Sequence, residues 1–316
     1  MTIASKAAKG GALSKNTQLT PYAHAATSPV SGIMLLIAST VFFSFTDVIT
    51  KHMTATLSVV EIAWIRYTTF SFIAAPLVFM AGGKALFRTK RPGLQILRGL
   101  GIVGSTLLFT QGLRYLPVAE STAIYFISPI LIMALSIVFL GESVGPRRWI
   151  AAGIGLIGVL VVIRPGTSAF QSTAFLPLLG ATSWAAGAIV TRKMSGVDHH
   201  LTTLVYSAVV GSAVLTMLLP FNWEMPQSGE IGLGLLMGLV FTIGQWFVVL
   251  AYRHADASVI APFSYVQLIW AGALGYLFFG SLPDGWTIVG ACIIAASGFY
   301  TAYRERVRVR EGSGRA

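Results

Sequence analysis

The chain of 316 residues has little charge and almost no cysteine. Charged residues make up 10% of it and hydrophobic residues 55%, whereas a soluble domain carries about 25% charge. So few polar groups could not cover a water-facing surface of this size. The scarcity of charge therefore excludes a soluble globular protein and indicates an integral membrane protein.

Several chemical motifs are absent as well. The single cysteine, Cys292, has no partner for a disulfide or a metal site. The five histidines fall in the N-terminal tail or between apolar runs, and no HExxH motif occurs. No G-x-x-x-x-G-K-[ST] motif is present, which argues against direct use of ATP. We therefore expect no enzyme activity, no cofactor and no metal.

Ten long apolar runs take up most of the chain. About 20 apolar residues cross a bilayer as a helix, and backbone polar groups in lipid must be satisfied internally, which excludes an open sheet. The sequence therefore predicts an all-α integral membrane protein. Its ten transmembrane helices are expected over residues 31–51, 60–81, 95–113, 118–140, 148–164, 173–192, 201–220, 230–250, 257–279 and 285–303.

The basic residues orient these helices. With the N-terminus in the cytoplasm, 18 of the 22 Lys and Arg residues lie on the inner side, as the positive-inside rule requires. Both termini are then cytoplasmic: a disordered basic tail over residues 1–30 and a second basic tail over residues 304–316. Because the net charge of +11 follows membrane loops, the expected partner is the lipid bilayer, and nucleic acid is not expected.

Two halves of the chain resemble each other. "ITKHM" at residues 49–53 matches "VTRKM" 141 positions later, and "ALSIVFLGE" matches "ALGYLFFGS" 139 positions later. Trp149 and Gly153 likewise match Trp286 and Gly290. Because each half has five spans, the second must enter the membrane in the opposite sense. The sequence thus predicts two inverted five-helix repeats, residues 31–165 and 172–303, around a central cavity, which is the architecture of secondary transporters.

The chain is similar to the EamA-type members of the drug/metabolite transporter superfamily over residues 31 to 303. The resemblance rests on the doubled unit and on the segments "RYLPVAESTAIYFISPI", "FLGESV" and "GIGLIGVLVVIRPG". The first half further resembles S-adenosylmethionine uptake carriers in Asp47 with Lys51, Glu61 with Arg66, and "ILRG" at 96–99. The resemblance implies a carrier of small organic solutes in the bacterial inner membrane.

The resemblance is weaker in the ninth span. The S-adenosylmethionine carriers have an Arg and a Glu where this chain has Ser264 and Gln267. The substrate therefore stays open between a solute like S-adenosylmethionine and one like an amino acid, and import, export and the coupling ion stay open too. A membrane binding or regulatory protein without transport activity is the alternative function.

Four charged residues lie where helices are expected inside the membrane. Asp47 and Lys51 share one helix face, in the order that favours an ion pair, whereas Glu61 and Arg66 are not expected to pair with each other. A charge at the bilayer centre costs roughly 2.5–3.5 kcal/mol, so these side chains should face the protein interior or water. They form either a structural ion-pair cluster or a site for solute or proton. For Asp47 and Arg66, the deeper pair, we favour the second.

Nine uncharged residues complete the predicted site for solute binding or coupling. Aromatic faces beside few charges suit a flat or cationic organic solute, although such side chains also fill helix interfaces. These residues are Tyr125, Ser128, Trp184, Gln245, Trp246, Ser264, Tyr265, Gln267 and Trp270.

Small residues cluster in the fifth span. Gly153, Gly155 and Gly158 would let helices approach closely. This pattern predicts tight packing, either within the bundle or between two protomers of a homodimer.

Overall fold

The computed structural model describes residues 29–83, 88–141, 146–167, 170–194, 197–198, 200–221, 223–254 and 261–313. The predicted N-terminal tail therefore lies outside the described residues up to residue 28. The described part is built from helices and turns, without a strand. The first half holds α1 (Pro29–Met53), α2 (Val59–Gly82), α3 (Pro92–Tyr115), α4 (Val118–Tyr125), α5 (Ser128–Leu140) and α6 (Pro146–Ile163).

The second half repeats this order. It holds η2 (Ser172–Ala174), α7 (Phe175–Met194), α8 (His200–Leu218), η3 (Leu219–Phe221), α9 (Ser228–His254), η4 (Ala261–Val266), α11 (Gln267–Phe279) and α12 (Gly285–Ser313). Helix α12 continues ten residues beyond the predicted last span, so the C-terminal tail begins as an extension of this helix.

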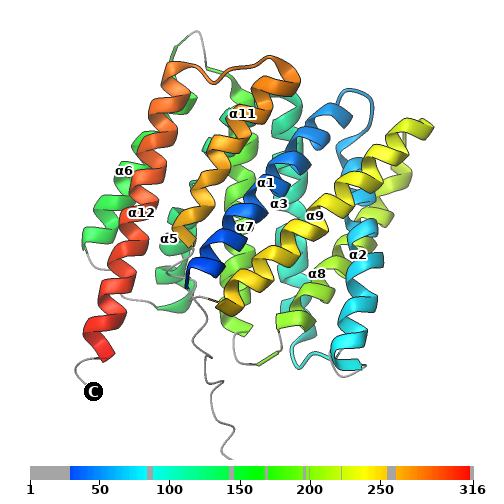
Figure 1. The fold of residues 1–316 in the computed structure, drawn as a ribbon, viewed down its shortest axis with the longest axis horizontal. Coiled ribbons are helices and arrows are strands. Elements are labelled where there is room, and N and C mark those ends of the chain that lie inside the picture. Colours follow the sequence, from blue (N-terminus) through cyan, green and yellow to red (C-terminus); the bar gives the residue numbers. More distant parts are fainter. Residues whose placement is uncertain are drawn as a thin grey trace, which may run out of the picture.

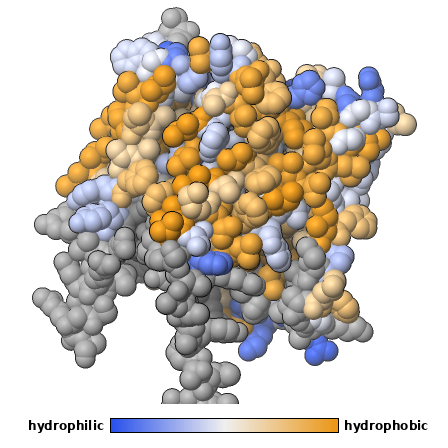
Figure 2. All heavy atoms as spheres, viewed as in Figure 1, coloured by the Kyte–Doolittle hydropathy of each residue, from blue (hydrophilic) through white to orange (hydrophobic). Residues whose placement is uncertain are grey.

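Ten of these segments cross the membrane. Six are long and apolar enough to span it: Val30–Met53, Pro92–Tyr115, Val118–Leu140, Ser172–Met194, Leu201–Phe221 and Ser228–Ala251. Trp149–Ile163, Phe263–Phe279 and Gly285–Tyr300 are shorter apolar helices, and α2, which carries Glu61 and Arg66, is the tenth. The face shown in Figure 2 is largely hydrophobic, with hydrophilic residues towards its upper and lower edges. Figure 1 shows α1 beginning and α12 ending at the same end of the bundle, as an even number of crossings requires.

The two halves are built alike. Helices α5 and α11 both have 13 residues, and each ends at a glycine in the left-handed region, Gly141 (φ 67°) and Gly280 (φ 64°). Glycine fits there because it has no Cβ to clash. These glycines are 139 positions apart, and the ends of α1 and α7, Met53 and Met194, are 141 apart. Both spacings equal those of the sequence matches.

Helices of one half pack mainly on helices of the other. Helix α1 lies along α9, and its counterpart α7 lies along α3, which is the counterpart of α9. Helices α2 and α8 contact each other, and so do α6 and α12. Every major contact therefore recurs when the halves are exchanged, which gives the bundle a pseudo-two-fold axis. Figure 1 shows α1 between α9 and α11, both from the second half.

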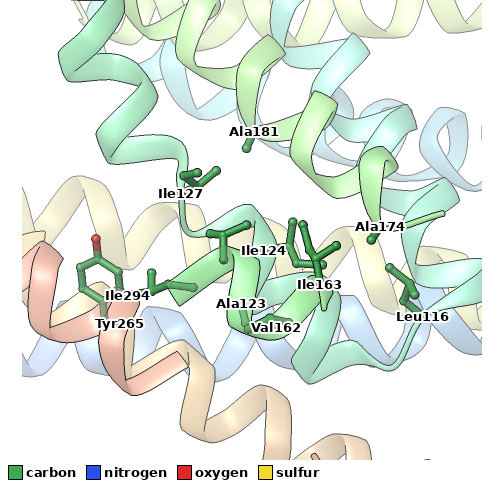
Figure 3. Packing of buried hydrophobic residues seen from close by; sticks show 11 residues of the cluster. Leu116, Ala123, Ile124, Ile127, Val162, Ile163, Ala174, Ala181, Tyr265 and Ile294 are labelled. Atoms are coloured by element: carbon green, nitrogen blue, oxygen red, sulfur yellow. The ribbon is translucent and has the colours of Figure 1, made fainter. Parts of the chain in front are cut away.

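The fourth span is interrupted. Pro129 lacks an N–H, and its ring would clash with the carbonyl of Tyr125 in a continuous helix; helix α4 ends at Tyr125, and α5 starts at Ser128 with Pro129 in its first turn. Ile124 and Ile127, on either side of the break, are buried in the largest apolar core, together with Val162 and Ile294. Figure 3 shows Ile127 on the turn between the two helices. The break is thus held by packing against α6 and α12.

Glycines bring α6 and α12 close together. A Cβ on Gly158 would lie 2.9 Å from the backbone oxygen of Gly290, and one on Gly290 would lie 2.6 Å from the oxygen of Gly158. Ser297 of α12 also donates a hydrogen bond of 2.5 Å to the carbonyl of Ala151 on α6. Gly155 and Gly158 therefore serve packing within the bundle, whereas Gly153 meets nothing within 4 Å.

This packing predicts opposite effects for two alanine substitutions on one helix. Gly158→Ala pushes two backbones apart and is expected to destabilise the protein by about 1–3 kcal/mol. Gly153→Ala points into open space and should stabilise it by up to about 1 kcal/mol, because alanine is the better helix former. Thermal unfolding of both purified variants in detergent checks this, and equal melting temperatures would contradict it.

Candidate solute-binding and coupling site

A buried polar cluster lies where the two halves of the bundle meet. Asp47 on α1 and Arg66 on α2 are 8% and 9% exposed, and Gln267 begins α11 in the second half. Tyr67 on α2 and Tyr125 on α4 are close enough to interact electrostatically with Arg66. The structure thus brings together four of the residues predicted from the sequence: the charged Asp47 and Arg66, and the uncharged Tyr125 and Gln267.

Asp47 is tied to the other half of the protein. Its Oδ2 accepts a hydrogen bond of 3.2 Å from the Nε2 of Gln267. One turn earlier on α1, the Ser44 hydroxyl lies 3.5 Å from the Gln267 carbonyl oxygen, which accepts its hydrogen bond. A carboxylate buried away from water needs a donor such as the Gln267 amide. Asp47 and Gln267 therefore connect α1 to the break before α11.

Arg66 is a buried cation for which the described part of the chain supplies no hydrogen-bond acceptor. Its guanidinium lies 5.3 Å from the ring centre of Phe241 and 5.9 Å from that of Tyr67, distances at which cation–π attraction acts. Asp47 is near enough for Coulomb attraction, yet among the described residues no salt bridge joins the two. The Arg66 Nε is enclosed and has no acceptor. The site therefore holds a positive charge that no described residue neutralises by direct contact.

Two tyrosines and their partners complete the cluster. The Tyr125 hydroxyl is 2.9 Å from Ser105 Oγ on α3, and the Tyr67 hydroxyl is 3.2 Å from Thr106 Oγ1. Sequence reasoning missed Tyr67, Ser105 and Thr106. For Tyr67 a signal existed, because it directly follows Arg66 in the polar run "RYTT". Phe241, whose ring packs on Phe43 and Phe70, was also missed, since it looks like any other apolar residue of its span.

Lys51 points to a helix end rather than to Asp47. Its Nζ donates hydrogen bonds of 2.8 and 2.7 Å to the carbonyls of Leu113 and Leu116, at the C-terminus of α3. A cation is favourable at this end because unpaired carbonyls and the negative end of the helix dipole gather there. Lys51 therefore joins α1 to α3.

Glu61 occupies the first turn of α2. Its backbone N–H donates to the side chain of the N-cap residue Ser58, and its Oε2 accepts a bond of 3.4 Å from the backbone N–H of Glu224. An acidic side chain is favourable at a helix N-terminus. These contacts give Glu61 a structural setting, and its contacts do not reach Arg66.

The other predicted site residues lie in several places. Ser128 is buried at the start of α5, and the buried Trp270 Nε1 on α11 has no acceptor among the described residues. Gln245 and Trp246 line a narrow cavity between α2, α8 and α9. Trp184 on α7 is 37% exposed, and Ser264 lies half-buried in η4.

Tyr265 packs in the largest apolar core. It is 6% exposed, and its ring packs against Phe126 and Phe299. Figure 3 shows it beside Ile294 in the core next to α12. It also borders an apolar groove of about 570 Å³ between α11 and α12. The polar cluster and this groove are therefore lined by different residues. In the described part of the chain, no three His, Cys, Asp or Glu side chains gather as a metal would need.

The fold and its buried polar site define a multi-pass membrane transporter. The EamA-like transporter family matches residues 30–164 and again residues 171–303. The chain belongs to this family, and it is a small-molecule membrane transporter. A solved crystal structure with 17% sequence identity matches 87% of the chain and 98% of its own length with a TM-score of 0.62, which shows the shared fold.

The names of similar proteins refer to different solutes. An S-adenosylmethionine uptake transporter of Rickettsia prowazekii is 30% identical over 277 residues, covering 88% of this chain and 94% of its own. A riboflavin transporter of Rhizobium johnstonii is 28% identical, covering 89% and 94%. The pseudopaline exporter CntI of Pseudomonas aeruginosa is 27% identical, covering 84% and 94%. These proteins have similar sequence identity to the chain but different solutes, so sequence similarity does not identify the solute of this protein.

The position of Lys51 predicts a structural role for its charge. Lys51→Met removes the donor to two carbonyls at the end of α3 and should destabilise the protein by about 1–3 kcal/mol. Lys51→Arg keeps a cation there and should lose less. Melting temperatures of the purified variants check this. A Lys51→Met protein that keeps its stability but loses transport would instead place Lys51 in solute binding.

Proposed function

We propose that the protein is a secondary carrier that moves a small organic metabolite across the bacterial inner membrane by alternating access, with both termini in the cytoplasm. The observation that carries the proposal is the buried Asp47–Gln267 contact, which joins the first half of the chain to the second. In carriers built from inverted repeats, the solute site lies at the interface of the repeats, near the bilayer midplane. The repeats proposed here are residues 31–165 and 172–303.

Asp47 is the proposed coupling residue. It is a buried titratable group in direct contact with the second half, so a proton on Asp47 would change the contact with Gln267. A proton gradient, or exchange of one solute for another, would then supply the energy. Arg66 and Tyr125 share its surroundings and are proposed to contact the solute, which is like S-adenosylmethionine or an amino acid.

The remaining predicted residues are proposed to have secondary roles in transport, according to their distance from the polar cluster. Ser128 and Trp270 lie at or near the starts of α5 and α11, beside the breaks that border the polar cluster. Lys51 and Glu61 act through helix ends. Five residues lie outside the polar cluster and would contact the solute only as it enters or leaves: Trp184, Gln245, Trp246, Ser264 and Tyr265.

Asp47→Asn tests the coupling role. Asparagine has nearly the same shape and can still accept the hydrogen bond of Gln267, so folding should be unaffected. Proteoliposomes are given S-adenosylmethionine, riboflavin or amino acids on the outside, and uptake is driven by a proton gradient. We expect the rate of this uptake to be at least tenfold lower for the variant than for wild type. Exchange of labelled for unlabelled solute at equal concentrations should continue.

The two measurements separate the alternatives. Loss of both gradient-driven uptake and exchange would place Asp47 in solute binding. Full gradient-driven uptake by Asp47→Asn would refute its role in coupling, while the wild-type protein in the same vesicles reports whether the chain is a carrier at all.

A further inference from the structure

We infer that the solute carries a single carboxylate and that Arg66 binds it. This inference rests on the proposed carrier function and names the chemical class of the solute. Arg66 is 9% exposed and its Nε is enclosed without an acceptor, and no hydrogen bond or ion pair joins its guanidinium to another described residue. A charge held away from water is normally paired, because an unpaired one is strongly unfavourable. The missing partner is therefore supplied by what the protein transports.

The geometry around Arg66 suits a planar anion. Its guanidinium is held against the rings of Phe241 and Tyr67, which fix the direction of its N–H groups. A guanidinium presents two parallel donors that match the two oxygens of a carboxylate. The packed rings thus prepare the donors before the solute arrives, which reduces the entropy lost on binding.

The charges nearby select a solute with only one negatively charged group. Asp47 lies within Coulomb range of Arg66, so a second negative charge on the solute would be repelled. The Lys51 ammonium is bound to carbonyls of α3 instead. A dianionic phosphate would therefore meet one cation and one carboxylate, whereas a carboxylate needs only Arg66.

A residue kept for binding differs from a residue kept for folding in its effect on the empty protein. If Arg66 waits for an anion, removing its charge relieves an unfavourable burial. In an Asp47→Asn background, where the attraction between the two charges is already absent, Arg66→Gln should therefore raise the melting temperature of the ligand-free protein. If Arg66 supports the fold, the same substitution should lower it. Glutamine keeps a polar end of moderate length and therefore limits the cavity left behind.

The test is a cycle of two ligands and two proteins. Binding of S-adenosylmethionine and of its decarboxylated form is measured by calorimetry to wild type and to Arg66→Gln, and the same is done for an amino acid and its amide. We expect wild type to prefer the carboxylate member of a pair at least tenfold, and Arg66→Gln to lose that preference. Arg114→Gln, which removes a charge of the same kind from the exposed end of α3, is the matched control and should keep it.

Three results would overturn the inference. They are an equal preference in both proteins, a melting temperature that Arg66→Gln lowers in the ligand-free Asp47→Asn background, and no binding of any carboxylate in the panel to wild type. None of these decides the carrier function, because vesicles that take up riboflavin, which has no carboxylate, would still show transport.

A second inference comes from comparing the two halves position by position. The spacing of 141 between α1 and α7 pairs Thr50 with Thr191, and the spacing of 139 between α3 and α9 pairs Arg98 with Met237. The contacts pair in the same way. Thr50 Oγ1 lies 3.2 Å from the sulfur of Met237, and the Arg98 Nε donates to Thr191 Oγ1 at 2.7 Å. The two clusters around these contacts are therefore equivalent places in the two halves.

One cluster is polar. Asp198, after α7, accepts hydrogen bonds from Thr89, from the Lys90 N–H at 3.0 Å and from Gln95 Nε2 at 2.9 Å. Burial raises the pKa of Asp198, but these hydrogen bonds outweigh it and hold the pKa below its usual value, so the carboxylate stays charged. Arg98 also donates to the Thr203 carbonyl at 3.2 Å and to Ser207. These contacts join the start of α3 to α7 and α8, at the end expected in the cytoplasm.

The other cluster has an apolar core, with the buried Glu61 beside it. Leu57 and Ile62 are the counterparts of Asp198 and Thr203, and they are buried with Met53, Ile65 and Met237. These residues join α1 and α2 to the start of α9. Figure 1 shows α1 ending and α9 beginning at the same end of the bundle, the end expected outside.

The pairing points to two gates of unequal chemistry. We propose that these clusters are the seals that open in turn during transport, and that the polar seal opens more readily. When the polar seal separates, water replaces its hydrogen bonds at little net loss. When the apolar seal separates, Leu57, Ile62 and Met237 become exposed to water, which is unfavourable in proportion to their area. Without solute the carrier therefore opens mainly towards the expected cytoplasmic side.

Labelling at equivalent positions tests the asymmetry. Thr203→Cys and Ile62→Cys are made on a Cys292→Ala background, which removes the native thiol. Both proteins are treated in detergent with a small water-soluble maleimide. We expect Thr203→Cys to react at least tenfold faster than Ile62→Cys. Equal rates, or the reverse order, would overturn the asymmetry.

A cross-link tests the gating itself. Thr89→Cys with Asp198→Cys, on the same background, places two thiols where the wild-type side chains are hydrogen-bonded. Oxidation should stop transport in vesicles, reduction should restore it, and each single-cysteine variant should be insensitive. Undiminished transport by fully cross-linked protein, or failure of the two thiols to cross-link, would overturn the proposal. Transport by the reduced protein reports separately on the carrier function.

Discussion

Lipid offers no hydrogen-bond partners, and this constraint decides what each charged side chain of the bundle can do. Lys51 satisfies its donors by hydrogen bonds to two carbonyls at the end of α3. Asp47 accepts a hydrogen bond from Gln267. Among the residues that the structure describes, Arg66 contacts aromatic rings and lies in the electric field of Asp47, without a hydrogen bond. A buried charge that the described residues leave partly unsatisfied is unfavourable in the empty protein, which argues for a ligand.

The two halves have equivalent backbone arrangements, but the side chains at equivalent positions differ in charge and polarity. In the second half, Ala188 and Ser207 stand where the first half has Asp47 and Arg66. The charged site is therefore one-sided, although the helix contacts around it recur in both halves. The same holds at the two ends of the bundle, where Asp198 corresponds to Leu57. Symmetry of the backbone supplies two related states, and asymmetry of the side chains sets which state is favoured.

The sequence predicted the spans and the repeat because both are local signals, written in apolar runs and in short matches at fixed spacing. It could not predict the Asp47–Gln267 contact, whose partners are 220 positions apart and lie in different halves. Nor could it show that Lys51 turns to α3. The setting of Glu61 was readable, since Ser58 followed three residues later by Glu61 is a capping box. The cation–π partner Phe241 left no signal, because position alone distinguishes it from other phenylalanines.

The two proposed roles in the polar cluster support each other. Asp47 and Arg66 are opposite charges within Coulomb range, and Gln267 adds a donor without adding charge. A solute carboxylate at Arg66 would compete with Asp47 for the positive charge nearby. The cluster would then be stabilised by a proton on Asp47, so that solute and proton favour each other's binding. By linkage this coupling is reciprocal. One buried arginine can thus serve both to recognise the solute and to tie its movement to a proton.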